Sequence, residues 1–169
     1  MKRILMTLAV TLAAVHAEQM PIHPDCKNSE FPEVCTKMVH DLIGELGYFN
    51  QVFAAGAPDE AAQAAAFYHP LATLYTIASG KFYVGRKDIE QNYFTPFVSL
   101  VRSAKVNFET FHYSVIDFDT IVAYGSLTAT GVLKDGTTFT QPPLPQTVTF
   151  VRNHRFDLKR PFLIISDHE

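Results

Sequence analysis

Phe67-Tyr68-His69-Pro70-Leu71-Ala72-Thr73-Leu74-Tyr75-Thr76 and Gly80-Lys81-Phe82-Tyr83-Val84-Gly85-Arg86-Lys87-Asp88-Ile89 are the two pieces of sequence that decide the fold. In order they indicate the end of a helix, a strand, a glycine turn, a short second strand and the beginning of a new helix. The residue before a proline avoids the helical region, so we expect the helix that leads into this stretch to stop at His69-Pro70. Several long strands follow, and such an arrangement can wrap into a cone with an apolar interior.

Two helices are predicted before this stretch and one directly after it. The first begins near Pro32, with one buried stripe at spacings of three and four formed by Val34, Met38, Leu42, Leu46, Phe49 and Phe53. The second is alanine-rich and runs from Glu60 to Tyr68 after a capping Asp59. The third begins at Gly85 or Arg86, and Pro96 inside it predicts a kink or a break.

Four extended segments are predicted downstream, at residues 104–117, 120–133, 138–151 and 162–167. Alternation along the first of them places Phe108 and His112 on one face. Gly125 and Gly131 mark bulges or bends of a curved sheet. The last segment is almost uniformly apolar, which is typical of a central strand covered on both faces. Helices, a strand pair, a helix and then a strand meander predict an α+β fold with a curved, antiparallel sheet wrapped around three N-terminal helices.

Residues 1–17 have the pattern of a signal peptide. Lys2 and Arg3 precede an apolar run that is too short to span a bilayer. The segment closes at Ala17 with small residues at the positions that a signal peptidase recognises. We expect cleavage after Ala17 and export, to the extracellular space or to the periplasm if the source is bacterial. An uncleaved membrane anchor is the alternative. Residues 18–31 would then be an irregular N-terminal arm, and residues 32–169 the folded domain.

The cysteines number two, Cys26 and Cys35. In an exported protein an isolated pair at this spacing predicts one disulfide, which would join the arm to the start of the first helix. The spacing is not that of a C-x-x-C redox motif, and there is no neighbouring Cys/His pair to complete a metal site.

Charge and motifs argue against several classes of function. Cleavage after Ala17 would change the net charge from −3 to −5, and a mildly acidic chain without a Lys/Arg cluster is not typical of proteins that bind nucleic acid or anionic membranes. The sequence contains no G-x-S-x-G, H-E-x-x-H or phosphate-binding glycine loop. No metal and no cofactor is therefore predicted.

The sequence resembles the nuclear-transport-factor-2-like superfamily, which includes ketosteroid isomerases, polyketide-cyclase-like (SnoaL-like) proteins and scytalone dehydratases. The resemblance lies in the helix–strand junction at Phe67–Leu74, the helix start at Gly85–Ile89 and the closing strand at Phe162–Asp167. It implies a cone-shaped barrel with a pocket between sheet and helices, and often a homodimer. The apolar residues on both faces of the strand at 104–117 would suit such a partner.

The resemblance argues against the isomerase reaction of that superfamily. Counting along the junction places the position of the isomerase's carboxylate base at Thr76, which cannot act as that base. The alternative is an isomerase or dehydratase that uses a His/Tyr/Asp set, for which the candidates are His112, Tyr48 and Asp167, with Tyr75 as the other possible tyrosine. Each also has a purely structural interpretation: His112 as an ordinary strand histidine, Asp167 as a solvated acid at a strand end, and Tyr48 as a wall residue.

The sequence favours a binding protein over an enzyme. Its 14 Phe and 7 Tyr residues are enough to line a pocket as well as a core, and apolar pockets need few polar groups to orient a small hydrophobic ligand. The predicted pocket residues are Tyr48, Tyr75, Phe94, Phe108, His112 and Phe150.

Overall fold

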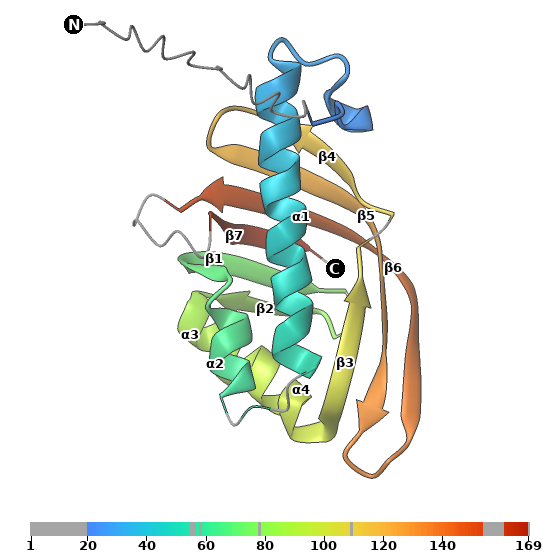
Figure 1. Ribbon diagram of the computed structural model, residues 1–169. Coiled ribbons are helices and arrows are strands. Elements are labelled where there is room, and N and C mark those ends of the chain that lie inside the picture. Colours follow the sequence, from blue (N-terminus) through green and yellow to red (C-terminus); the bar gives the residue numbers. More distant parts are fainter. Residues whose placement is uncertain are drawn as a thin grey trace, which may run out of the picture.

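The computed structural model describes residues 20–54, 57, 59–77, 79–108, 110–153 and 161–168. The predicted signal peptide, residues 1–17, lies outside the described residues. Within them, seven strands form one curved sheet, and a long helix, α1, lies across one of its faces (Figure 1). The predicted α+β class, with a mostly antiparallel sheet around N-terminal helices, is confirmed.

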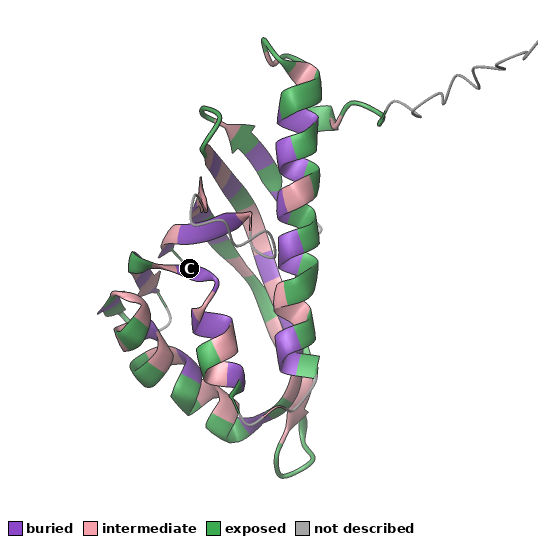
Figure 2. Ribbon diagram, turned by 60° about the vertical axis from the view of Figure 1, so that its left-hand side comes forward, coloured by how far each residue is buried: buried purple, intermediate pink, exposed green. Residues whose placement is uncertain are grey.

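The helical elements are η1 (Pro24–Cys26), α1 (Pro32–Ala54), α2 (Glu60–Ala65), α3 (Arg86–Asp88), η2 (Ile89–Phe94) and α4 (Thr95–Leu100). The buried residues of α1 recur at helical spacing and include Met38, Leu42 and Leu46, so one face of this helix packs on the sheet side while the other stays exposed (Figure 2). Asn50 fixes the far end of α1, because its side chain donates to the Val106 carbonyl (2.8 Å) and accepts from the Val106 N–H (2.7 Å).

The predicted interruption at Pro96 is confirmed in a specific form. The helix that begins at Arg86 widens into the π-helical segment η2 and then continues as α4, with Pro96 in the first turn of α4. A proline has no N–H, so it cannot donate the hydrogen bond that a regular α-helix makes to the carbonyl four residues earlier. In a π-helical segment the hydrogen bonds reach five residues back instead of four. The Thr95 hydroxyl donates to the Glu90 carbonyl (2.8 Å) just before the proline.

The strands are β1 (Tyr68–Thr76), β2 (Lys81–Val84), β3 (Val101–Asn107), β4 (His112–Val115), β5 (Thr120–Leu133), β6 (Thr138–Arg152) and β7 (Phe162–His168). Their order is β2-β1-β7-β6-β5-β3, and β4 also pairs with β5. The apolar β7 lies between β1, to which it is parallel, and β6, to which it is antiparallel. The prediction that the last strand is central is confirmed.

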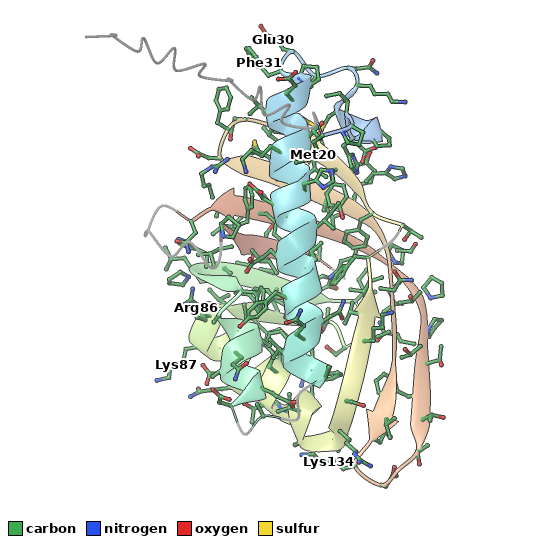
Figure 3. The ribbon with its side chains drawn as sticks, viewed as in Figure 1. Met20, Glu30, Phe31, Arg86, Lys87 and Lys134 are labelled. Atoms are coloured by element: carbon green, nitrogen blue, oxygen red, sulfur yellow. A yellow bond between two sulfur atoms is a disulfide. The ribbon has the colours of Figure 1, made fainter. Side chains whose placement is uncertain are left out.

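The junction at Phe67 differs from the prediction in one respect. The second helix ends at Ala65, and β1 begins already at Tyr68, before Pro70, with an irregular register against β7 between Tyr68 and Thr73. Arg86, which is labelled in Figure 3, lies at the start of α3. Its Nε donates to the Tyr68 carbonyl (2.6 Å), and this hydrogen bond connects β1 to α3. The helix predicted to extend to Tyr68 is therefore shorter, and Tyr68 is a strand residue.

The segment predicted as one strand at residues 104–117 is two strands, β3 and β4. The Phe111 N–H donates to the Phe108 carbonyl (3.1 Å), so the chain turns between them. This turn breaks the alternation of side chains. Phe108 stays on the inner side, whereas His112 is exposed and its neighbours Phe111 and Tyr113 are buried.

The N-terminal arm is joined to α1 by the predicted Cys26–Cys35 disulfide, which is present. The arm packs on β4: Asp25 Oδ2 accepts from the Tyr113 N–H (2.8 Å), and the rings of His23 and Tyr113 lie 5.7 Å apart. The arm thus covers Tyr113, a residue of the strand face for which a partner subunit had been the expected cover.

Gly131 of β5 lies where two other elements approach the strand closely. A Cβ at this position would collide with the Ser103 carbonyl oxygen of β3 and would lie 2.6 Å from the Phe139 ring of β6. Gly44 in α1, by contrast, has no atom within 4 Å of an added Cβ. The two glycines therefore have opposite structural roles, the first permitting close packing and the second only lowering helix stability.

Gly131→Ala is expected to destabilise the protein by about 1–3 kcal/mol, because the strands must move apart to admit the methyl group. The matched control Gly44→Ala is expected to stabilise it by about 0.5–1 kcal/mol through helix propensity. Urea unfolding followed by circular dichroism measures both. Equal effects of the two substitutions would contradict the close approach at Gly131.

Candidate functional site

A cavity of about 90 Å³ lies within the cone, between the helices and the sheet. Ten of its twenty lining residues are aromatic, six are aliphatic and four are acids or amides. They are Phe49, Phe53, Phe67, Tyr68, Tyr93, Phe94, Phe97, Phe108, Phe150 and Phe162, then Leu46, Val106, Leu127, Ala129, Val148 and Ile164, then Glu45, Gln141, Gln146 and Asp167. The interior is thus an apolar space with a few polar groups, which is the usual composition of a small-molecule site.

Phe49 of α1 is the centre of the aromatic wall. Its ring centroid lies 5.1 Å from those of Phe53 and Phe67, 6.3 Å from that of Phe94 and 6.4 Å from that of Phe108. All four pairs are edge-to-face, the arrangement that aromatic quadrupoles favour. One helical side chain therefore contacts rings from α1, the α2–β1 junction, η2 and the residue that follows β3.

Three polar side chains from three adjacent strands meet at the cavity. The Tyr68 hydroxyl of β1 donates to Asp167 Oδ2 of β7 (2.7 Å), and Gln146 Nε2 of β6 donates to Asp167 Oδ1 (2.7 Å). Asp167 is 3% exposed and Gln146 is 6% exposed. Both oxygens of a buried carboxyl group thus accept a hydrogen bond, as a buried polar group requires.

Burial raises the pKa of the Asp167 carboxyl above its ordinary value of 3.8. The hydrogen bonds from Tyr68 and Gln146, and the neighbouring His168, act in the opposite direction without cancelling the cost of burial. A carboxyl group with a raised pKa in an apolar cavity is a candidate for ligand binding or proton transfer.

The structure places only some of the predicted pocket residues on the cavity. Phe94, Phe108 and Phe150 line it. Tyr48 is 45% exposed and is not among the lining residues. Tyr75 lies on the opposite side of β1 from the buried Leu74, with its ring beside those of Phe82 and His168, and it also lies outside the cavity.

His112 lies outside the cavity as well. Its side chain is 64% exposed, and Nδ1 lies 3.4 Å from Asp25 Oδ1 of the arm. The set of His112, Tyr48 and Asp167 is therefore not brought together. The error has a physical cause: the turn between β3 and β4 reverses the side-chain alternation on which the orientation of His112 had been based.

Asp167 is the catalytic candidate that does line the cavity, and its expected position as a solvated acid at the strand end is wrong. β7 extends one residue past it to His168, and both neighbouring strands cover it. Glu45, Gln141 and Gln146 also line the cavity and are not among the residues predicted from the sequence. A polar residue within an otherwise apolar buried strand is a signal that applies to Asp167, whereas Gln146 follows Pro142, Pro143 and Pro145, which are typical of an edge strand or a loop.

A second hollow, of about 550 Å³, lies between the arm, the start of α1 and β4. Its lining includes the acids Asp25, Glu30 and Asp117 and the exposed rings of Phe31 and Phe118. None of its lining residues carries a buried side-chain oxygen or nitrogen that lacks a hydrogen bond, as Gln146 does. The smaller cavity is therefore the candidate site.

Metal and membrane sites have no counterpart in the part of the chain that the structure describes. Those residues include no group of three or more His, Cys, Asp or Glu side chains arranged to hold a metal ion. Their helices also include none with the length and apolar character needed to cross a membrane.

Comparison with known proteins shows the fold. No protein-family model matches the sequence, and no curated protein matches it significantly. A Xanthomonas campestris structure named as a calcium/calmodulin-dependent protein kinase II association domain is 24% identical, with a TM-score of 0.61 over 79% of this chain and 84% of that one. A nuclear-transport-factor-2-like superfamily protein from Salmonella enterica is 14% identical, with a TM-score of 0.57 over 80% of this chain and 88% of that one.

A third similar structure contains a small molecule. It is a Catenulispora acidiphila protein in complex with S-DNPA, 14% identical, with a TM-score of 0.55 over 78% of this chain and 91% of that one. The chain has the nuclear-transport-factor-2-like fold. The resemblance found in the sequence is thereby confirmed at the level of the fold, and the aromatic cavity occupies the interior of a nuclear-transport-factor-2-like cone.

Asp167→Asn is expected to change how the stability of this cone depends on pH. A carboxyl group whose pKa is raised by folding contributes stability below its unfolded pKa of about 3.8, and this contribution is lost as pH rises through the folded value. An asparagine side chain does not ionise, so the variant does not lose stability in this way as pH rises. Its stability relative to the wild type should therefore increase from pH 4 to pH 8, by roughly 1.4 kcal/mol for each unit by which folding raises the pKa.

The control is Asp135→Asn, in an exposed turn where the Thr137 N–H lowers the pKa of the carboxyl group. The stability of Asp135→Asn relative to the wild type should therefore decrease as pH rises, because the variant lacks the stabilisation that the ionised Asp135 provides. Urea unfolding at several pH values measures the slopes. Parallel pH profiles for the wild type and Asp167→Asn would show that burial does not perturb Asp167.

Proposed function

We propose that this chain is an exported protein that binds a small, largely apolar molecule in the aromatic cavity of its cone. The observation that carries the proposal is a cavity of about 90 Å³ with ten aromatic lining residues and the buried Tyr68–Asp167–Gln146 group. Aromatic walls provide apolar contact area, and a few fixed polar groups orient the guest. The C. acidiphila structure with S-DNPA supports the idea that a fold of this kind can hold a small molecule.

The size of the cavity limits the ligand. An apolar cavity of about 150 Å³ admits benzene, which has six non-hydrogen atoms, so a cavity of about 90 Å³ suits a guest of roughly three to five non-hydrogen atoms. Five-membered rings such as furan and pyrrole are therefore appropriate probes. Larger ligands would require the aromatic wall to move.

Export is proposed from the sequence of residues 1–17, and the Cys26–Cys35 disulfide supports it, because disulfides persist in oxidising compartments. A homodimer, which the fold resemblance implies, would cover exposed apolar side chains of β1 and β2 such as Leu71, Phe82 and Val84. Export and the dimer are both separate from the ligand-binding proposal.

Ala129→Leu is expected to weaken the binding of furan or pyrrole at least about tenfold, because the larger side chain fills the cavity. The matched control is Ala54→Leu on the exposed end of α1, which should bind as the wild type does. Titration followed by the ¹H–¹⁵N chemical shifts of the lining residues measures the affinity. If neither probe shifts these resonances in the wild-type protein, the cavity is not a binding site for molecules of this size.

A second candidate function is proton transfer at carbon next to a carbonyl group, as in an isomerase or dehydratase. The raised pKa of Asp167 at the cavity supports it, with the Tyr68 hydroxyl as the neighbouring donor. In this scheme the Asp167 carboxylate removes a proton from the α-carbon to give an enolate, and the resulting carboxylic acid delivers the proton to another carbon of the enolate, which isomerises the substrate. Return of a solvent-derived proton to the α-carbon gives exchange instead, which is the simplest sign of the same base. The proposed participants differ from the His112, Tyr48 and Asp167 set suggested by the sequence.

Acetone, a ketone of four non-hydrogen atoms, tests this second candidate in D₂O. The wild-type protein should accelerate exchange of its α-protons for deuterium, and Asp167→Asn should lower that acceleration at least about tenfold. Loss of the α-proton signal in ¹H NMR spectra measures the rate, with protein-free buffer as the baseline. A wild-type rate equal to that of buffer, or an unchanged rate in the variant, would exclude Asp167 as the base.

A further inference from the structure

The side-chain oxygen of Gln146 has no use in the fold itself. Gln146 is 6% exposed and lines the cavity, and among the described residues no group donates a hydrogen bond to its Oε1 atom. A buried carbonyl oxygen without a donor carries a substantial cost in stability. A side chain that only filled space at this position would be apolar.

The orientation of the Gln146 amide is fixed by its neighbour. Nε2 donates to Asp167 Oδ1 (2.7 Å), and an oxygen in place of Nε2 would face a carboxylate oxygen. The other carboxylate oxygen, Oδ2, already accepts from the Tyr68 hydroxyl (2.7 Å). Asp167 therefore holds the amide so that its nitrogen is engaged and its oxygen is available as an acceptor.

We propose that the ligand of this cavity is a small, mostly apolar molecule that carries one N–H or O–H group and donates it to Gln146 Oε1. This inference rests on the proposed binding function and specifies the chemical class of its ligand. The rest of the ligand should be apolar, since sixteen of the twenty lining residues are aromatic or aliphatic. Specificity follows from the unpaired acceptor, because a guest without a donor leaves it buried and unpaired.

Pyrrole and furan form a matched pair for the test. Both are five-membered aromatic rings of five non-hydrogen atoms, and pyrrole carries an N–H donor where furan carries an oxygen. Furan is the more apolar molecule, so a cavity that offers only apolar contacts would bind furan more tightly. A hydrogen bond to Gln146 reverses this order, and pyrrole is expected to bind roughly three- to tenfold more tightly than furan.

The Gln146 resonance provides a direct readout that requires no variant. The side-chain ¹³Cδ signal of Gln146 should move downfield on addition of pyrrole and stay in place with furan, because only pyrrole donates to the attached oxygen. The exposed Gln51 of α1 provides the reference signal in the same spectra. Pyrrole binding without a shift of the Gln146 signal would overturn the proposal.

Gln146→Leu should abolish the preference for pyrrole, and the matched surface substitution Gln51→Leu should retain it. Tighter or equal binding of furan by the wild type, or a preference for pyrrole that survives in Gln146→Leu, would overturn the proposal while leaving the binding function intact. If neither ring binds, the binding function itself fails and this inference fails with it.

Discussion

The cost of burying the Asp167 carboxyl group constrains the centre of this structure. β7 lies between β1 and β6, and Asp167 on its inner face is only 3% exposed to solvent. The fold compensates with one donor from each neighbour, Tyr68 from β1 and Gln146 from β6. The cross-strand partners of Asp167 are Leu74 of β1 and Val148 of β6, so the Tyr68 and Gln146 side chains reach the carboxyl group from positions further along their strands.

The cavity depends on a different property, the stiffness of aromatic rings. Phe49 contacts rings from four parts of the chain, each in edge-to-face geometry. Planar, rigid rings packed in this way leave space between them that flexible aliphatic side chains would fill. The α3–η2–α4 helix contributes Tyr93, Phe94 and Phe97 to the same wall. The π-helical segment before Pro96 therefore belongs to the element that closes the cone.

The sequence predicted the elements of the fold because apolar periodicity, Pro70 and Gly85 act locally. It predicted Phe94, Phe108 and Phe150 on the cavity for the same reason. The prediction for His112 is wrong because a backbone turn at Phe108–Phe111 changes which side chains of the segment face inward. The segment contains no glycine or proline that would have predicted this turn. Gln146 is not predicted on the cavity because Pro142, Pro143 and Pro145 are typical of an edge strand or a loop, and the edge is what the structure has. β6 tolerates them because that half pairs only with β5 and is an edge on its other side.

The polar end of the cavity distinguishes a site from a packing defect. A void lined only by Phe and Leu side chains would cost stability without selecting anything. Here the same void contains an acid with a raised pKa and an amide whose nitrogen is engaged and whose oxygen accepts no bond from the described residues. Two apolar side chains at these positions would fill the same space without the cost of burying polar groups. The energetic penalty of keeping it is explained if a guest completes the hydrogen-bond network, because the guest then supplies what the fold leaves open.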